Sequence, residues 1–230
     1  MKISIIIPTY NEEKKIAACL AQFRGRLSEE EVIVVDGGSQ DNTVEIIRRF
    51  PGIKQYSAAR SNRGYQLNKG AEVASGEWLV FLNADIQLPP DWRNELYKAA
   101  AAGFRAGCFR LAYGRAGELP LSNKLAAWLT SLGSHYTRFP YGHQAVFVEK
   151  LAFDTLGGYK DIPVMEDYEF SLRFYKSIGK FYRSLREVGL SFRRFRGRCL
   201  SAVITMWFFP KLFRLGISPY WLAKFYKAVR

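Results

Sequence analysis

The sequence has 230 residues, 48% of them hydrophobic and 24% charged, and its formal net charge is +13. This composition suits a globular chain with one large core, alone or with an appendage. Three cysteines at no metal-like spacing argue against a disulfide framework and fit a reducing compartment. The apolar run at residues 3–7 is too short for a signal peptide, so we expect a cytoplasmic protein.

Strands and helices are expected to alternate along most of the chain. Apolar runs predict strands at residues 3–7, 32–35, 78–82, 106–113 and 144–148. Helical spacing predicts helices near residues 12–24, 41–49, 91–102 and 166–178, one after a polar loop within 57–75, and one carrying Leu125, Leu129 and Leu132. This order indicates a single α/β domain with a mostly parallel central sheet flanked by helices. We expect that domain to cover residues 1–195, followed by a helical extension over residues 196–230.

The first three predicted strands each lead into an acid, namely Glu12, Asp36 and Asp85. A parallel α/β sheet binds ligands outside the carboxyl ends of its strands. Three carboxylates gathered there could hold a base, a ribose and a divalent cation. The sequence therefore predicts a nucleoside diphosphate site at this edge of the sheet.

Each of these strand ends also has a simpler interpretation. A base could lie beside Tyr10, but the segment 8–12 could equally be a loop with a helix-starting acid. Asp36 could accept a hydrogen bond from a base or ribose, or it could only form a turn with the glycines that follow it. Asp85 could bind a hard cation together with diphosphate oxygens, or it could cap the following turn.

Basic residues precede the third of these strands. The segment 58–70 contains Arg60, Arg63 and Asn68, and two arginines before a helix can meet a diphosphate. A solvated basic loop is the alternative interpretation of the same residues.

A second group of candidates lies later in the chain. Glu166 and Asp167 begin a predicted helix, where acids are common as caps, although a carboxylate facing a cleft can also be a general base. His143 and Gln144 are expected to form the floor of an acceptor side, with the reservation that a lone histidine is usually structural.

The order IIIPTYNEE, VVDGGSQDNT, VFLNAD and MED resembles the family 2 glycosyltransferases, which have the so-called GT-A fold. The resemblance runs from residue 2 to about residue 195. It is similar to a small bacterial subgroup, the radical-SAM/selenodomain-associated transferases, because of the segment 142–145, the segment 157–167 and the basic, aromatic end. The resemblance implies inverting transfer of a sugar from a nucleotide diphosphate donor to an acceptor hydroxyl, assisted by Mn²⁺ or Mg²⁺.

The resemblance also implies roles for individual residues. It assigns the nucleoside to four of them, Pro8, Tyr10, Glu12 and Asp36. Asp85 would be the retained acid of the family's D-x-D metal motif, in which Asn83 replaces the first acid. Asp167 would be the base that deprotonates the acceptor, and Glu166 would bind the acceptor or orient the loop. Arg194 would contact the diphosphate, in a late motif where Phe195 stands in place of a tryptophan.

Other activities remain as alternatives to a glycosyltransferase. A nucleotidyltransferase of the same fold class would need a glycine-rich, arginine-containing loop where residues 10–13 are acidic. A nicotinamide dehydrogenase would need G-x-G-x-x-G after the first strand, and the sequence lacks it. The non-enzymatic alternative is a nucleotide-binding module, or a module whose basic tail grips nucleic acid or membrane. We expect no nucleic acid partner for the enzyme.

The positive charge is concentrated at the C-terminal end. Residues 1–175 contain 21 Lys and Arg against 20 acids, whereas residues 176–230 contain 13 against one. Within this end the apolar run 200–209 is interrupted by Pro210-Lys211, before the ~20 apolar residues that a spanning helix needs. The basic, aromatic composition predicts contact with an anionic surface.

Two interpretations of residues 200–230 stay open. They pack on the core or in a homodimer, or they form an interfacial helix pair. In the second interpretation five aromatic residues enter the headgroup layer, namely Trp207, Phe208, Phe213, Trp221 and Phe225. Four cations would then face anionic lipid, namely Lys211, Arg214, Lys224 and Lys227. The enzyme would be peripheral on the inner face of the membrane, beside a carbohydrate or lipid-linked acceptor.

Overall fold

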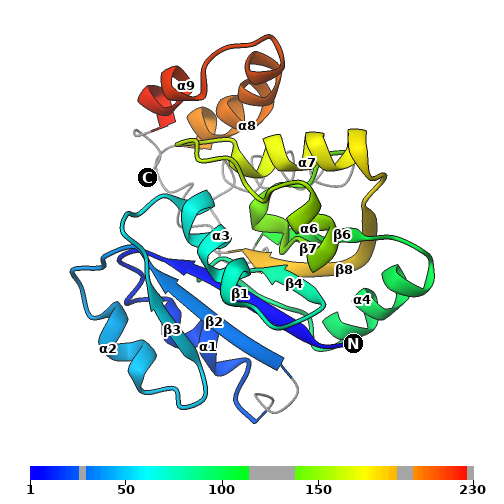
Figure 1. Cartoon of the computed structure of the whole chain (residues 1–230). Helices are drawn as coiled ribbons and strands as arrows, with labels where there is room; N and C mark the ends of the chain where they lie inside the picture. Colours follow the sequence, from blue (N-terminus) through cyan, green and yellow to red (C-terminus); the bar gives the residue numbers. More distant parts are fainter. Residues whose placement is uncertain (26–29, 114–137, 191–198, 227–230) are drawn as a thin grey trace.

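Figure 1 shows a computed structural model of the protein, which describes residues 1–25, 30–113, 138–190 and 199–226. Some features expected from the sequence fall outside the described residues. They are the helix with Leu125, Leu129 and Leu132, the late motif with Arg194 and Phe195, and the cation Lys227.

The described strands form one sheet of eight, in the order β3-β2-β1-β4-β7-β6-β8-β5. Their bounds are β1 Ile3–Thr9, β2 Glu30–Asp36, β3 Lys54–Ser57, β4 Trp78–Phe81, β5 Ile86–Gln87, β6 Ala106–Tyr113, β7 Phe147–Glu149 and β8 Tyr182–Leu190. Strand β1 is parallel to β2 and β4, β2 is parallel to β3, and β6 is parallel to β8. Strand β7 is antiparallel to β4 and β6, and β5 is antiparallel to β8. The expected α/β class with a mostly parallel sheet is confirmed.

Helices cover both faces of this sheet. Their bounds are α1 Ile16–Ala21, α2 Thr43–Arg48, α3 Arg63–Val73, α4 Trp92–Ala101, the 3₁₀ turn η1 Gly142–Gln144, α6 Lys150–Thr155 and α7 Glu166–Ser177. Side chains of α1, α2 and α4 pack with Ile5 and Ile7 in one core cluster. Side chains of α3, α6 and α7 pack with Ile6 in the other. Successive residues of β1 thus enter opposite cores, which explains why Ile5, Ile6 and Ile7 are all apolar.

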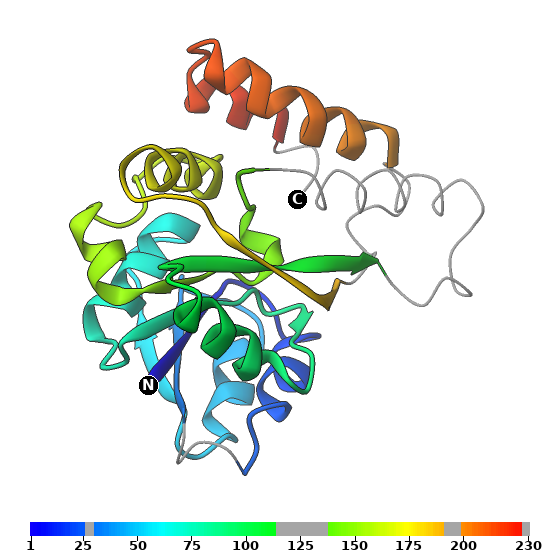
Figure 2. The ribbon, with the colours of Figure 1, turned by 90° about the vertical axis from the view of Figure 1, so that its right-hand side faces the viewer.

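Two further helices, α8 Cys199–Arg214 and α9 Pro219–Tyr226, lie outside these layers, beyond α7 (Figure 2). Phe209 of α8 and Leu222 of α9 are buried against Val164, in the segment that leads into α7. Pro210, which interrupts the apolar run, does not end the helix, because α8 continues through this residue. A proline inside a helix costs about 3 kcal/mol, which the burial of neighbouring Phe209 helps to offset. Within the described part of the chain, no helix is both long and apolar enough to cross a bilayer.

Several elements differ from the sequence prediction. Strands β3, β5 and β8 and helix α6 were not predicted, and the helix expected near residues 12–24 is confined to Ile16–Ala21. The strand expected at residues 144–148 begins at Phe147, because residues 142–144 form the 3₁₀ turn. These differences leave the three strand ends at the carboxyl edge of the sheet where the sequence predicted them.

Candidate active site

The carboxyl ends of β2, β1 and β4 lie side by side. Thr9 at the end of β1 is paired with Asp36 at the end of β2. On the other side of β1, the Leu82 amide donates to the Ile6 carbonyl at 3.0 Å, so residues 83–85 follow directly beside it. Gln66 of α3 fastens this edge, since its buried amide nitrogen donates to the Thr9 and Val35 carbonyls at 2.8 Å each.

The Asp36 carboxylate is buried and holds a tight turn. Its Oδ2 accepts hydrogen bonds from the Gly38 and Ser39 amides at 2.9 Å, and its Oδ1 accepts from the Ser39 hydroxyl at 2.5 Å. Gly37 is needed for packing, because a Cβ there would lie 2.8 Å from the Ser61 Cα. The Asx-type turn considered for Asp36 is therefore present, and a contact with a ligand stays a prediction.

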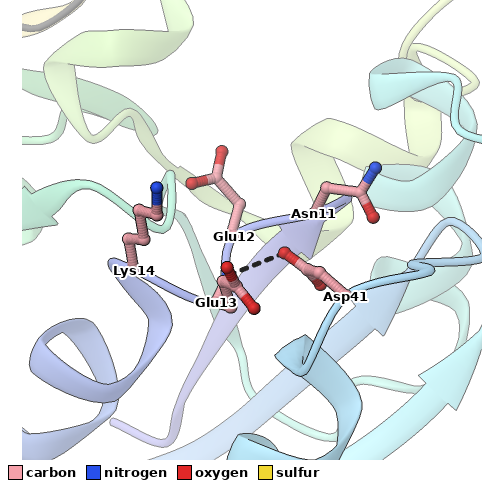
Figure 3. Close-up of a pocket in the computed structure, with 5 residues that line it drawn as sticks. All are labelled: Asn11, Glu12, Glu13, Lys14 and Asp41. Carbon is pink, nitrogen blue, oxygen red and sulfur yellow. Dashed lines mark hydrogen bonds between the residues drawn. The ribbon is translucent and has the colours of Figure 1, made fainter.

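The loop after β1 borders an open hollow of about 410 Å³ (Figure 3). Its lining residues are Asn11, Glu12, Glu13, Lys14 and Asp41. The loop is held to the start of α2, because the Glu12 amide donates to the Thr43 Oγ1 at 2.7 Å and the Glu13 amide to the Asp41 Oδ2 at 3.2 Å. In Figure 3 the Glu12 side chain points away from the Glu13–Asp41 contact. Exposed Tyr10 begins the same loop, and half-buried Pro8 lies near the end of β1.

The segment after β4 places Asp85 near Cys19 of α1. The Cys19 thiol has its pKa raised to about 12, first by burial and then by the negative charges of Asp85 and Glu12. Both carboxylates therefore act on one buried thiol, whose Sγ donates to the Asn83 carbonyl at 3.9 Å. Asn83, two residues before Asp85, is also buried, with 8% of its surface exposed. The carboxylates predicted from two strand ends, Glu12 and Asp85, are thus gathered in one region.

Arg63, the first residue of α3, joins the segment after β4 to the start of α7. Its Nε and Nη2 donate to the Asn83 Oδ1 at 3.2 and 3.1 Å, and its Nη1 donates to the Glu166 Oε1 at 2.8 Å. The Arg63 and Glu166 side chains are 20% and 9% exposed, which makes this a largely buried ion pair. The guanidinium lies against Gly142, where a Cβ would be 2.1 Å from Nη2.

The titration of Arg63 and of Glu166 is shifted by neighbouring charges and by burial. Burial alone would lower the pKa of the Arg63 guanidinium, but the Glu166 and Asp167 carboxylates outweigh it and raise that pKa. Burial raises the pKa of the Glu166 carboxyl, and Asp167 adds to the rise, while Arg63 acts in the opposite direction. Two adjacent acids therefore share one buried cation.

Asp167 differs from Glu166 in exposure and partners. It is half-buried, and its Oδ2 accepts from the Gly142 amide at 2.7 Å while its Oδ1 accepts from the Tyr168 amide at 2.7 Å. Met165, which precedes the two acids, has a left-handed φ of 69°. Such backbone is uncommon outside glycine and clusters at functional sites.

Four other predicted residues lie around this group. Arg60 is exposed, pairs with Asp161 and stacks on Tyr65. The Asn68 amide forms a reciprocal pair of hydrogen bonds with the Tyr159 backbone, at 2.8 and 2.9 Å. Two further candidates, Gln144 and His143, lie in η1. Buried Gln144 donates to the Phe109 carbonyl at 3.2 Å, and His143 stacks on Tyr141 with ring centroids 5.6 Å apart.

The sequence argument missed the roles of two residues, Gly142 and Gln66. The bond from the Gly142 amide to Asp167, and the space that Gly142 leaves for Arg63, depend on segments distant in sequence. Gln66 is a polar residue inside a helix, and only its 3% exposure separates it from an ordinary surface glutamine. No local pattern could have identified either role.

Comparison with known proteins gives one family. The profile of the family described as "Glycosyl transferase family 2" matches residues 4–152, which is more than half of the chain. A "PGL/p-HBAD biosynthesis glycosyltransferase" of Mycobacterium bovis is 29% identical over 203 residues, covering 84% of this chain and 77% of the relative. A "Dolichyl N-acetyl-alpha-D-glucosaminyl phosphate 3-beta-D-2,3-diacetamido-2,3-dideoxy-beta-D-glucuronosyltransferase" of Methanococcus voltae is 28% identical over 212 residues, covering 78% of this chain and 63% of the relative.

Solved structures share the fold. The S. aureus TarS 1-349 complex with UDP-GlcNAc has a TM-score of 0.64 at 19% identity, over 83% of this chain and 58% of that one. The mannosyltransferase PcManGT from Pyrobaculum calidifontis, in complex with GDP-Man and Mn²⁺, has a TM-score of 0.59 at 18% identity, over 99% and 73%. This chain thus spans less than two thirds of the TarS structure, and at such identities the likeness concerns the fold alone.

Proposed function

Because this chain belongs to glycosyl transferase family 2, we propose that it transfers a sugar from a nucleoside diphosphate donor to an acceptor hydroxyl, with inversion at the anomeric carbon. The expected family and its GT-A fold are confirmed, whereas the resemblance to the radical-SAM/selenodomain-associated subgroup stays a prediction. The observation that carries the proposal is the bridge from Asn83 through Arg63 to Glu166. This bridge links two places. The first is the carboxyl edge of the sheet, where a nucleotide sugar could bind, and the second is the start of α7, where an acceptor hydroxyl could bind.

The donor side is proposed to lie at the ends of β1 and β2. Exposed Tyr10 and half-buried Pro8 offer an apolar surface for the base, and Glu12 borders the adjoining hollow. Asp36 shapes the turn on the other side, and any further bond to the base would add to those it accepts from Gly38 and Ser39. The solved relatives bind a uridine and a guanosine donor, so the base is left open.

A divalent cation fits Asp85 in the manner usual for hard cations, which take one or two carboxylates and complete their shell with phosphate oxygens. Among the described residues there is no group of three potential side-chain ligands, so the diphosphate would have to supply the rest. Asp85 would hold Mn²⁺ or Mg²⁺, and the cation would offset the negative charge that grows on the leaving phosphate. Arg194 is proposed as a second diphosphate contact, outside the described residues.

On the acceptor side, Asp167 is proposed as the general base. Its half-buried carboxylate is held by the Gly142 and Tyr168 amides, which leave further lone pairs for an acceptor hydroxyl. As the acceptor oxygen bonds to the anomeric carbon, Asp167 takes its proton and the bond to the diphosphate oxygen breaks. A positioned base typically contributes ~10²–10⁴-fold.

Glu166 is proposed to position Asp167 rather than to take the proton itself. It is 7% exposed and is paired with Arg63, so it orients the start of α7. Gln144 and His143 lie in η1, the turn whose Gly142 amide donates to Asp167. Arg60 and Asn68 hold the neighbouring loop through Asp161 and the Tyr159 backbone.

The acceptor is proposed to be a carbohydrate or lipid-linked hydroxyl, with the enzyme in the cytoplasm or peripheral on the inner face of the membrane. Support comes from the M. voltae relative, whose name contains a dolichyl phosphate acceptor. The proposed sugar transfer does not depend on what the C-terminal helices bind or on whether the protein forms a homodimer.

The test is a screen of uridine and guanosine diphosphate sugars for Mn²⁺-dependent hydrolysis or transfer. With an active donor, Asp167→Asn should lower turnover ~10²–10⁴-fold and leave donor affinity unchanged, because the amide keeps the volume but cannot take the proton. Asp154→Asn, at an exposed position of α6, is the matched control and should behave as the wild type. Turnover near wild type in Asp167→Asn would remove Asp167 from the base role.

A further inference from the structure

We propose that helices α8 and α9 form a docking surface for an anionic lipid bilayer and present the start of α7 to that bilayer. The orientation of α7 toward the bilayer rests on the proposed function, because it concerns the side of the enzyme where the acceptor is proposed to bind. Figures 1 and 2 show the helix pair beyond α7, on the side of the molecule opposite the N-terminus.

The helix pair exposes an unusually large share of apolar side chains. Of the twelve large hydrophobic side chains that are exposed in the described part of the chain, seven lie between residues 207 and 225. They are Trp207, Phe208, Leu215, Ile217, Tyr220, Trp221 and Phe225. Monomeric soluble proteins rarely expose large contiguous apolar patches without a partner. Tryptophan and tyrosine in particular are enriched where protein meets the lipid headgroup layer.

The positive charge of this surface indicates that its partner is negatively charged. Lys211 and Lys224 are exposed beside the aromatic residues, and Lys211 lies 5.6 Å above the Phe208 ring. Arg214 is directed to the inner side instead, because its guanidinium lies 5.6 Å from the centroid of the Phe139 ring. No acid follows Glu187 in the sequence. Cations beside exposed aromatic rings, without acids, match an anionic headgroup layer, in which rings enter the boundary and ammonium groups meet phosphate.

The inner side of the helix pair rests on the segment that leads into α7. Phe209 and Leu222 are buried against Val164, which lies two residues before Glu166. Phe213 meets the Tyr168 ring edge-on, with centroids 6.2 Å apart, on the first turn of α7. A bilayer held by the outer side would therefore lie a single helix layer away from Asp167, within reach of a hydroxyl on a lipid carrier.

The experiment is co-sedimentation of the full chain with vesicles of phosphatidylcholine, with and without phosphatidylglycerol. We expect binding to the anionic vesicles at low salt and weaker binding at high salt, because exposed charges are screened. Trp207→Ala/Trp221→Ala should lower the partition coefficient on the order of tenfold, and Lys211→Gln/Lys224→Gln roughly 25-fold, about fivefold for each charge.

Matched variants separate docking from general effects. Tyr97→Ala removes an aromatic side chain that is 49% exposed, close to the 48% of Trp221, from helix α4. Lys2→Gln/Lys180→Gln removes two exposed charges elsewhere. Both controls should bind as the wild type, and unchanged circular dichroism should show that all variants fold.

Three results would overturn the proposal. They are equal sedimentation with neutral and anionic vesicles, control variants that lose as much binding as the helix variants, and a concentration-dependent dimer that Trp207→Ala/Trp221→Ala abolishes while vesicles are ignored. Vesicle binding needs no turnover, so its failure leaves the proposed sugar transfer intact. Likewise, an inactive but vesicle-binding protein would count against the transfer alone.

Discussion

Arg63 is expected to determine how stability depends on pH. The change Arg63→Met keeps most of the side-chain stem but removes three hydrogen bonds, two to Asn83 and one to Glu166. Glu166 would then be a buried carboxylate without its guanidinium. Breaking a buried ion pair by removing one partner typically costs 3–5 kcal/mol, so we expect a loss of about 3–5 kcal/mol at neutral pH.

The size of this loss should fall in acid. In the wild type, burial and Asp167 already raise the pKa of Glu166 above its ordinary value of 4.5, and Arg63 limits the rise. Removing Arg63 raises this pKa further. A carboxyl with a raised pKa binds its proton more tightly in the folded state, so its contribution to stability is full below 4.5 and is lost as pH rises. The deficit of Arg63→Met should therefore be smallest below that pH and grow toward neutrality.

Urea unfolding of the wild type and of Arg63→Met, from below pH 4.5 to neutral pH, measures the difference in unfolding free energy directly. Arg60→Met is the matched control, because Arg60 pairs with Asp161 at the surface, where the two side chains are 54% and 49% exposed. Surface pairs contribute about 0–1 kcal/mol, so its deficit should be small and nearly independent of pH. A deficit in Arg63→Met as small and flat as that of Arg60→Met would refute the buried-pair argument.

Two further pairs of variants test the proposed donor side and the packing of Arg63. Asp85→Ala should lose Mn²⁺-dependent affinity for uridine or guanosine diphosphate, by roughly 10–100-fold, and Asn83→Ala should lose less, because a carboxylate anchors the cation and an amide does not. Titrations with and without Mn²⁺ check this, and equal affinities in both variants would contradict it. Gly142→Ala should cost ~1–3 kcal/mol, because its Cβ would meet Arg63 at 2.1 Å, whereas Gly189→Ala, with open space around it, should be near neutral in the same urea assay.

The strands of the sheet differed in how well the sequence predicted them. Strands were predicted at residues 3–7 and 106–113, close to the observed Ile3–Thr9 and Ala106–Tyr113, because strands buried on both faces are rich in apolar residues. Tyr182–Leu190 was missed, since Leu185 in it is 72% exposed and its buried positions include Ser184. Its place in the sheet comes from pairing with β6, which is distant in sequence and leaves no local pattern.

The residue types of the site could be predicted, but their contacts could not. Acids at strand ends are visible in the sequence because each follows an apolar run. The bridge made by Arg63 spans 20 positions to Asn83 and 103 positions to Glu166. A bond of this kind depends on how two segments pack, so the arginine was predicted as a diphosphate contact from its loop alone. The left-handed backbone of Met165 is equally invisible, because methionine gives no sign of it.

The bridge also offers a physical reason for an amide at position 83, where the family pattern has an acid. One buried guanidinium already faces two carboxylates, since Glu166 pairs with Arg63 and Asp167 lies close enough to raise the Arg63 pKa. A third carboxylate at position 83 would compete for the same charge and raise the pKa of Glu166 further. The Asn83 carbonyl oxygen accepts two hydrogen bonds from Arg63 without adding charge, which leaves the ion pair with Glu166 intact. Asn83 thus suits a site in which Asp85 is the acid proposed to bind the cation. In the same site, Arg63 links the segment after β4 to the start of α7.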